Sequence, residues 1–152
     1  MKRACEDVIA QCSDTVARPL RDWAARVRVY TNPSLSSGTK PDRASTGSNA
    51  SIAALASQDW ASLQAAETLD SSFRASCGRD LRGAATRVAL YLEESRTITV
   101  LLAHVRERVA GDYAMFGDVA KGLHGLNIEG KLMTTHECLS LVRRACEVDG
   151  IA

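Results

Sequence analysis

The sequence predicts an all-α protein, an antiparallel up-and-down helical bundle of three long helices and a short C-terminal helix. Apolar residues recur at steps of three and four along most of the 152 residues, the spacing of one helix face. Alanine is abundant and aromatic residues make up only 5% of the chain, which favours helix over strand. A hydrophobic fraction of 45% suffices for one core, so we expect a single helical domain over 1–152.

The first long helix is expected over residues 1–30, where one apolar stripe runs from Cys5 to Tyr30. Pro19 lies inside it and removes a backbone hydrogen bond, which predicts a kink or a split, although packing of both halves on one core would hold them nearly collinear. Residues 31–49 are rich in Ser, Thr, Gly and Pro without periodicity, which predicts a flexible surface loop. A tolerated insertion explains this loop better than a phosphorylated switch.

The second long helix is expected to end at Tyr91. A short helical turn at 52–56 precedes it, and Ser57 or Asp59 is the expected cap. Two glycines interrupt the helical stripe, each unfavourable by roughly 1 kcal/mol relative to alanine. We therefore predict a bend at 77–79.

A polar corner at 93–97 is expected to connect the second and third helices. Ser95 or Thr97 is the expected cap of the third helix, whose stripe runs from Ile98 to Leu123. These spacings predict a helix that continues through Gly111.

The last part of the chain predicts a connection and a short helix. Glycines are too frequent at 122–130 for a helix. Thr134 and Glu137 then have the spacing of a capping box, in which each side chain satisfies a free N–H of the first turn. The last helix is therefore expected to begin near Thr134.

Four residues give predictions about the core. Tyr91 and Trp60 are expected to be mostly buried between helices. Replacing Leu90 or Leu101 by alanine is expected to destabilise the fold by roughly 2–5 kcal/mol.

Composition excludes several function classes. The net charge of +1 gives no reason to expect a nucleic-acid partner. No apolar run approaches the ~20 residues of a transmembrane helix, and Glu6 and Asp7 come too early for a secretory signal. The five cysteines form no C-x-x-C pair, which indicates reduced thiols in a cytosolic protein.

The residues give no convincing catalytic, cofactor or metal site. His136 and Cys138 suggest metal or nucleophile chemistry, but H-E-x-x-H is absent and zinc needs about four converging ligands. Glu93 and Glu94 are adjacent, so on a helix their side chains diverge by roughly 100° and do not share one substrate. His104 is interpreted as a hydrogen-bonded structural histidine. We therefore predict a protein that is not an enzyme and binds no cofactor or metal.

Charged residues in the middle of the chain are the candidates for partner contact. A solvated helix face is their default role, and contact with an acidic partner or anionic lipid headgroups is the sharper alternative. The candidates are Arg87, Glu93, Arg96, Arg106 and Arg108.

The segment 81–109 also resembles a known family. A helix ends in Leu-Tyr-Leu, a polar corner with a threonine follows, and the next helix begins with Ile-x-x-Leu, a basic β-branched stretch and later aromatics. These features fall on Leu90-Tyr91-Leu92, Thr97, Ile98 with Leu101, Val105-Arg106, and Tyr113 with Phe116. Further similar stretches are 1–30, 57–60 and 133–142. Together they resemble the C-terminal region of the third subunits of the conserved oligomeric Golgi complex, a vesicle-tethering family.

The resemblance implies a helical rod of the tethering-complex type, forming the C-terminal part of a longer subunit. Its expected function is that of a non-catalytic scaffold in intra-Golgi retrograde transport, cytoplasmic and peripheral on Golgi membranes. Its implied partners are sister subunits, membrane-fusion proteins, small GTPases and coat proteins. An unrelated helical adaptor or assembly subunit is the alternative, and a small enzyme or metal protein using His136 and Cys138 is the third hypothesis.

Overall fold

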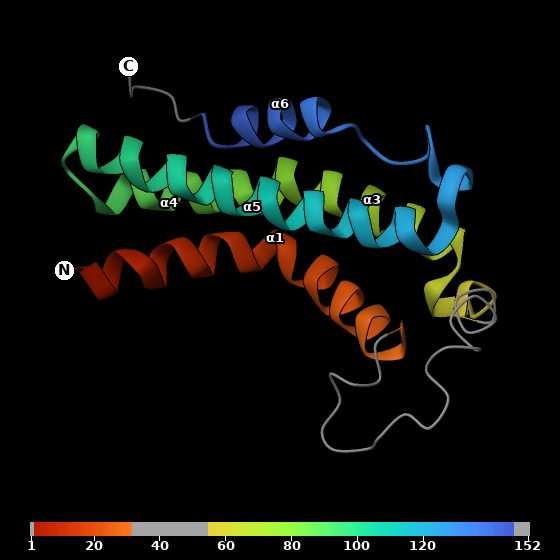
Figure 1. The fold of residues 1–152 in the computed structure, drawn as a ribbon. Coiled ribbons are helices and arrows are strands. Elements are labelled where there is room, and N and C mark those ends of the chain that lie inside the picture. The colour runs from red at the N-terminus through yellow and green to blue at the C-terminus, as the bar shows by residue number, and fades with distance from the viewer. Residues whose placement is uncertain (1, 32–54, 148–152) are drawn as a thin grey trace.

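The computed structural model describes residues 2–31 and 55–147, and in these ranges the chain forms helices and connecting turns without a strand (Figure 1). The predicted all-α class is therefore confirmed. The helices are α1 (Lys2–Thr31), α3 (Leu63–Ser76), α4 (Arg82–Tyr91), α5 (Ser95–His124) and α6 (Thr135–Ala145). Short 3-10 segments at Asp59–Ala61 and Gly125–Ile128 and a π-helical segment at Cys77–Leu81 connect or interrupt them.

The helices form a bundle around α5. Successive rods run in alternating directions, with α3 and α4 joined end to end as the second long rod (Figure 1). The longest helix pairing is that of α1 with α5, and α6 covers another side of α5. The expected three long rods and one short helix are therefore present.

Four aromatic residues from three helices form the aromatic core, namely Trp23, Phe73, Tyr113 and Phe116. Trp23 of α1 meets Phe116 of α5 edge to face, with ring centroids 5.2 Å apart. Phe73 of α3 stacks on Tyr113 of α5 at 5.0 Å. Each of the four side chains is buried, so this cluster holds α1, α3 and α5 together.

A buried polar network adjoins the aromatic core. The Tyr113 hydroxyl donates to the Asp70 carboxylate and accepts from the Met133 backbone N–H at 2.9 Å. The Arg74 guanidinium reaches the other Asp70 oxygen at 2.9 Å. The network therefore ties α3, α5 and the segment before α6, and it supplies partners to polar groups that would be costly to bury alone.

Two predicted irregularities are present in the helices. α1 is one helix that contains Pro19 and bends near its middle (Figure 1), as the missing N–H predicts. Where a bend was predicted at 77–79, the helix contains the π-helical segment Cys77–Leu81.

Two expected helix caps are wrong. Asp59–Ala61 forms a 3-10 turn, so α3 starts later and Ser62 caps it by accepting from the Ala65 N–H at 3.1 Å. At α5 the cap position is Glu94, whose side chain makes no capping bond. The Thr97 hydroxyl donates to the Glu94 carboxylate at 2.8 Å instead.

The capping box predicted at the start of the last helix is present. The Thr134 hydroxyl accepts from the Glu137 N–H at 3.2 Å, and the Glu137 carboxylate accepts from the Thr134 N–H at 2.8 Å, which confirms the capping box. The connection at 122–130 begins later than predicted, because α5 continues to His124 and ends at Gly125 with φ of 59°.

The predicted loop lies almost entirely outside the described residues. Thr31, expected to begin it, is the last residue of α1, and 32–49 are not described. Of the turn expected at 52–56, only Leu55 and Ala56 are described, and both are helical.

Candidate functional site

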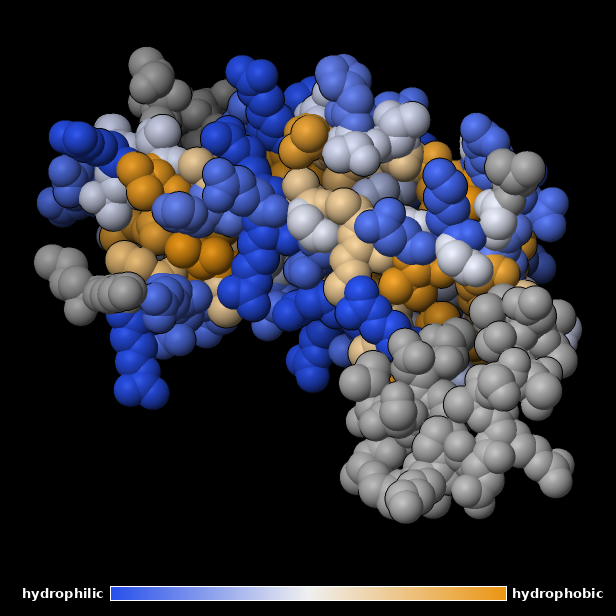
Figure 2. All heavy atoms as spheres, viewed as in Figure 1, coloured by the Kyte–Doolittle hydropathy of each residue, from blue (hydrophilic) through white to orange (hydrophobic). Residues whose placement is uncertain are grey.

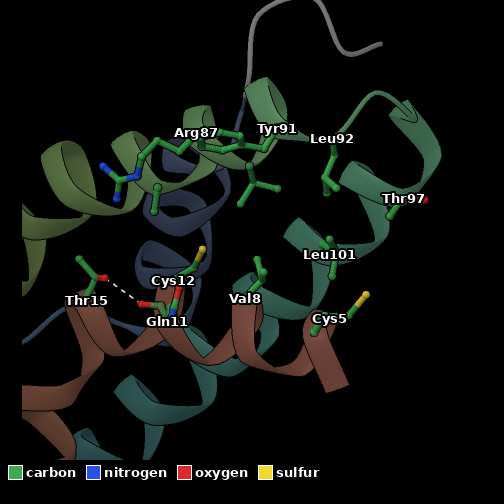
Figure 3. Close-up of a pocket in the computed structure, with 13 residues that line it drawn as sticks. Cys5, Val8, Gln11, Cys12, Thr15, Arg87, Tyr91, Leu92, Thr97 and Leu101 are labelled. Atoms are coloured by element: carbon green, nitrogen blue, oxygen red, sulfur yellow. Dashed lines mark hydrogen bonds between the residues drawn. The ribbon is translucent and has the colours of Figure 1, made fainter. Parts of the chain in front are cut away.

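An apolar groove lies between the first half of α1 and α4, and the start of α5 closes one of its ends. Its volume is about 530 Å³. The buried floor consists of Cys12, Ala84, Val88 and Leu101, and half-buried Cys5, Val8, Leu92 and Thr97 form its sides. The exposed rim consists of Ala4, Gln11, Thr15, Arg87 and Tyr91. Figure 3 shows the α1 and α4 side chains facing each other across the open space.

The groove opens where α1 and α4 separate. Farther along, α1 packs against α3 and against the π-helical segment Cys77–Leu81, but it makes little contact with α4. The apolar stripe of α1 nevertheless continues into this half through Cys5, Val8 and Cys12. Cys12 is buried in the groove floor, whereas Cys5 and Val8 remain partly exposed along the sides of the groove.

Arg87 is the basic residue of the groove rim. Its guanidinium extends from α4 toward the end of the groove marked by Thr15 (Figure 3). Within residues 2–31 and 55–147, Arg87 makes no hydrogen bond or ion pair. The nearby Asp80 carboxylate binds Arg79 instead, at 3.1 Å, and Arg87 is only the smallest contributor to the lowered pKa of Asp80.

The predicted burial of Tyr91 is wrong, and Leu90, whose replacement was expected to destabilise the fold, is exposed as well. Tyr91 is 83% exposed and Leu90 is 77% exposed. Tyr91 shares the helix face of Val88, but this face borders the groove instead of a neighbouring helix. Leu90 is roughly 200° around the helix from Val88 and faces away from the core. Replacing Leu90 by alanine is therefore no longer expected to destabilise the fold by several kcal/mol.

Trp60 is partly buried and packs against the hydrophobic core, which agrees with its expected burial. The Arg26 guanidinium lies 3.9 Å from the centre of its ring, and the Tyr30 ring lies 5.4 Å away. Both neighbours come from the exposed end of α1. The end of α1 therefore supplies two of the contacts that cover the indole.

A second hollow continues the groove across the end of the bundle. It shares Cys5, Thr97 and Leu101 with the groove, and its volume is about 410 Å³. Figure 2 shows apolar atoms gathered over α1 and the start of α5 at the end that carries the N-terminus. Charged side chains of both signs, Glu6, Glu94 and Arg96, border this hollow together with His104.

The five predicted contact residues occupy different surfaces. Arg87 lines the groove, Arg96 lines the second hollow, and Glu93 is exposed in the corner between α4 and α5. Arg106 lies farther along α5, where its charge partly opposes the burial that raises the pKa of the Cys146 thiol to about 11. Arg108 borders a shallow depression with Glu107 and Ile9. The structure therefore brings only Arg87, Glu93 and Arg96 to the same end of the bundle.

His136 and the buried cysteines do not form a reactive site. His136 is exposed, whereas Cys138, two residues later, is buried. Burial raises the pKa of the Cys138 thiol to about 12. Burial also raises the pKa of the Cys77 thiol to about 12, and the neighbouring Cys138 and Cys146 add to this effect. These thiols are therefore protonated near neutral pH, where a nucleophile or a metal ligand has to be a thiolate.

His124, and not His104, has the surroundings expected of a hydrogen-bonded structural histidine. His104 is exposed, with the Glu107 carboxylate 3.6 Å from its ring nitrogen. The His124 ring nitrogen instead lies 2.9 Å from the Ala61 carbonyl, linking α5 to the turn before α3. Among the residues that the structure describes, no group of three or more His, Cys, Asp or Glu side chains is arranged to hold a metal ion.

Sequence reasoning missed the groove because its walls carry the same apolar stripes as the core. Val8 and Cys5 follow the same spacing as buried Val16 and Leu20. The signal that could have revealed the groove was Tyr91. It is an aromatic residue at the end of the second helix, next to a polar corner, where fewer helices are available to cover it.

No protein-family model, curated protein or solved structure matches this chain. Across 2–31 and 55–147, no helix combines the length and the apolar character needed to cross a membrane. The candidate site therefore has to be interpreted from its own residues.

Proposed function

We propose that this chain is a non-catalytic helical scaffold of a multisubunit vesicle-tethering complex that acts in intra-Golgi retrograde transport through protein–protein contacts. One observation supports the proposal most strongly. Four residues of the motif that resembles the third subunits of the conserved oligomeric Golgi complex, Tyr91, Leu92, Thr97 and Leu101, line the apolar groove. A motif that faces an open groove favours a role in binding over one in folding alone.

The chemistry of the groove supports binding by surface burial. Its floor is apolar, and its rim carries an exposed tyrosine and an arginine, residue types that are enriched at the centres of protein interfaces. The proposed partners are sister subunits first, with membrane-fusion proteins, small GTPases and coat proteins as further candidates. The proposed location is the cytoplasmic face of Golgi membranes, held there peripherally.

Purification of the tagged chain from its own cells tests the proposal. We expect subunits of a Golgi tethering complex to co-purify in defined ratios, identified by mass spectrometry, and to remain associated through gel filtration. A tagged chain with Leu90→Ala, outside the groove lining, serves as the matched control and should recover the same subunits. Recovery of a different, stoichiometric complex would assign the chain to an unrelated adaptor and reject the tethering role.

A further inference from the structure

We propose that the groove between α1 and α4 receives one amphipathic α-helix from a partner protein, and that an acidic side chain of that helix pairs with Arg87. This inference rests on the proposed scaffold function and names the chemistry of its partner. Three features of the groove carry it: its dimensions, its apolar floor and its unpaired guanidinium.

The dimensions of the groove fit a helix. The α1 residues that line it extend from Ala4 to Thr15, which is roughly 16 Å, or three helical turns, at 1.5 Å per residue. On α4 the lining extends from Ala84 to Tyr91, roughly 10 Å. A third helix laid along the groove would pack its rows of side chains between those of α1 and of α4.

The α1 and α4 sides of the groove allow a helix to approach closely. The floor is apolar and buried, so it accepts the apolar face of an incoming helix; it consists of Cys12, Ala84, Val88 and Leu101. Ala4 and Thr15 on the α1 rim are small, which leaves room for another backbone. Tyr91 on the opposite rim is 83% exposed, and its ring would cover the incoming helix from the α4 side.

The charge of the groove selects the partner's polar residue. Arg87 makes no hydrogen bond or ion pair with any other residue of the described ranges, and Asp80 is already held by Arg79. A carboxylate placed beside the guanidinium would form a charge-assisted and bidentate pair at the edge of an apolar site. The preferred helix therefore carries Asp or Glu next to its apolar stripe, at the end that meets Thr15.

The acyl chain of a fatty acid would fit the features of the groove less well than a helix does. It would fill the floor and place a carboxylate near Arg87, but it would leave the exposed Tyr91 ring and the polar Gln11 and Thr15 rim without new partners. A helix has side chains that reach both rims. The acyl chain is therefore the competing outcome of the test.

The test is a selection from a displayed library of 18-residue amphipathic helical peptides whose charged positions vary, carried out on the full chain. We expect recovered peptides to be enriched in Asp or Glu at one position beside the apolar stripe. Arg87→Glu should weaken their binding tenfold or more and shift the selected residue to Lys or Arg. Arg82→Glu is the matched control, since Arg82 is exposed on the same helix outside the groove lining, and it should change binding by less than twofold.

A second pair of variants tests the apolar wall. Tyr91→Ala should weaken peptide binding about tenfold, whereas Leu90→Ala, equally exposed but outside the lining, should leave it unchanged. Thermal melts should show that all four variants fold. If Arg87→Glu fails to fold, Arg87→Gln removes the charge without reversing it and should still abolish the preference for acidic residues.

Three outcomes of the binding experiments would overturn the inference. They are recovery of no helical peptide, equal loss of binding in Arg87→Glu and Arg82→Glu, and saturable binding of a fluorescent fatty acid that Tyr91→Ala removes. The two proposals fail separately. Tethering subunits that co-purify equally with wild type and Arg87→Glu would retain the scaffold function and reject the groove, whereas acid-bearing peptides without co-purifying subunits would retain the groove and reject the tethering role.

Discussion

The half of the bundle around Phe116 and the half around Tyr91 are built from the same kind of amphipathic helix, but they differ in what covers the apolar faces. Around Phe116, side chains from α1, α3 and α5 enclose one another, and the polar network of Asp70 and Tyr113 closes the space toward α6. Around Tyr91, α1 and α4 diverge and leave a groove of about 530 Å³. In the half around Phe116, side chains of the chain itself cover the apolar faces. In the half around Tyr91, part of the apolar stripe lies at the surface.

This difference separates folding from binding within one small domain. Substitutions in the enclosed half should act on stability, because every neighbour of the altered side chain is fixed by the fold. Substitutions on the rim of the open half should act on partner binding and leave the isolated chain almost as stable as before.

The largest effect is expected for Phe116→Ala in the aromatic core. Phe116 is completely buried and contacts the Trp23 and Tyr113 rings. Its removal should lower the free energy of unfolding by roughly 3–5 kcal/mol, since the enclosed cavity cannot collapse fully. Urea unfolding followed by circular dichroism measures the change. A loss below 1 kcal/mol would mean that the aromatic cluster is not the centre of the fold.

Leu101→Ala should be less costly, at about 2 kcal/mol, which is the lower end of the range for a buried leucine. Leu101 is 5% exposed and forms part of the groove floor, so the space left by its side chain opens to solvent instead of forming a closed cavity. The same urea titration compares it with Phe116→Ala. Equal losses for the two variants would contradict the distinction between an enclosed half and an open half.

Tyr113→Phe should destabilise the fold by roughly 1–2 kcal/mol. The change keeps the ring but removes the hydroxyl that serves the Asp70 carboxylate and the Met133 N–H, leaving two buried polar groups short of a partner. Hydrogen exchange of the Met133 amide should become faster in the same variant. Unchanged exchange and stability would show that water or Asp70 alone satisfies the N–H.

Alkaline pH should weaken the enclosed half through its buried thiols. Burial raises the Cys138 pKa from 9.0 to about 12, so the unfolded chain releases this proton before the folded chain does. The stabilising contribution is present below pH 9 and is lost as pH rises from 9 toward 12, by about 1.4 kcal/mol per pH unit for one thiol. Cys138→Ala should reduce this slope of unfolding free energy against pH, whereas Leu139→Ala, exposed on the same helix, should not.

The predictable parts of the fold are those that depend on residues close in sequence. The capping box of Thr134 and Glu137 lies within one helical turn, so its residue types suffice to place it. The bend of α1 follows from the chemistry of Pro19 alone. The periodic stripes predicted the long helices because each stripe repeats over many turns.

The features that sequence reasoning missed depend on distant contacts. α3 begins at Leu63, beyond a 3-10 turn whose Trp60 carbonyl accepts from the Trp23 indole at 2.8 Å, across 37 positions of the chain. Burial depends on distant neighbours too, because an apolar stripe does not encode what covers it. Val16 and Val8 belong to one stripe, but only Val16 is enclosed.

The smallest effect on stability is expected for Tyr91→Ala, the residue whose predicted burial was wrong. Its side chain is 83% exposed on the groove rim, so folding of the isolated chain buries little of it, and alanine is the better helix former. The free energy of unfolding should change by no more than about 0.5 kcal/mol, as for other exposed positions, and Leu90→Ala should behave alike. A loss of 2 kcal/mol for Tyr91→Ala alone would mean that the groove is closed in solution and that its rim belongs to the core. Unchanged stability in both variants, with partner binding lost only in Tyr91→Ala, would place Tyr91 in an interface.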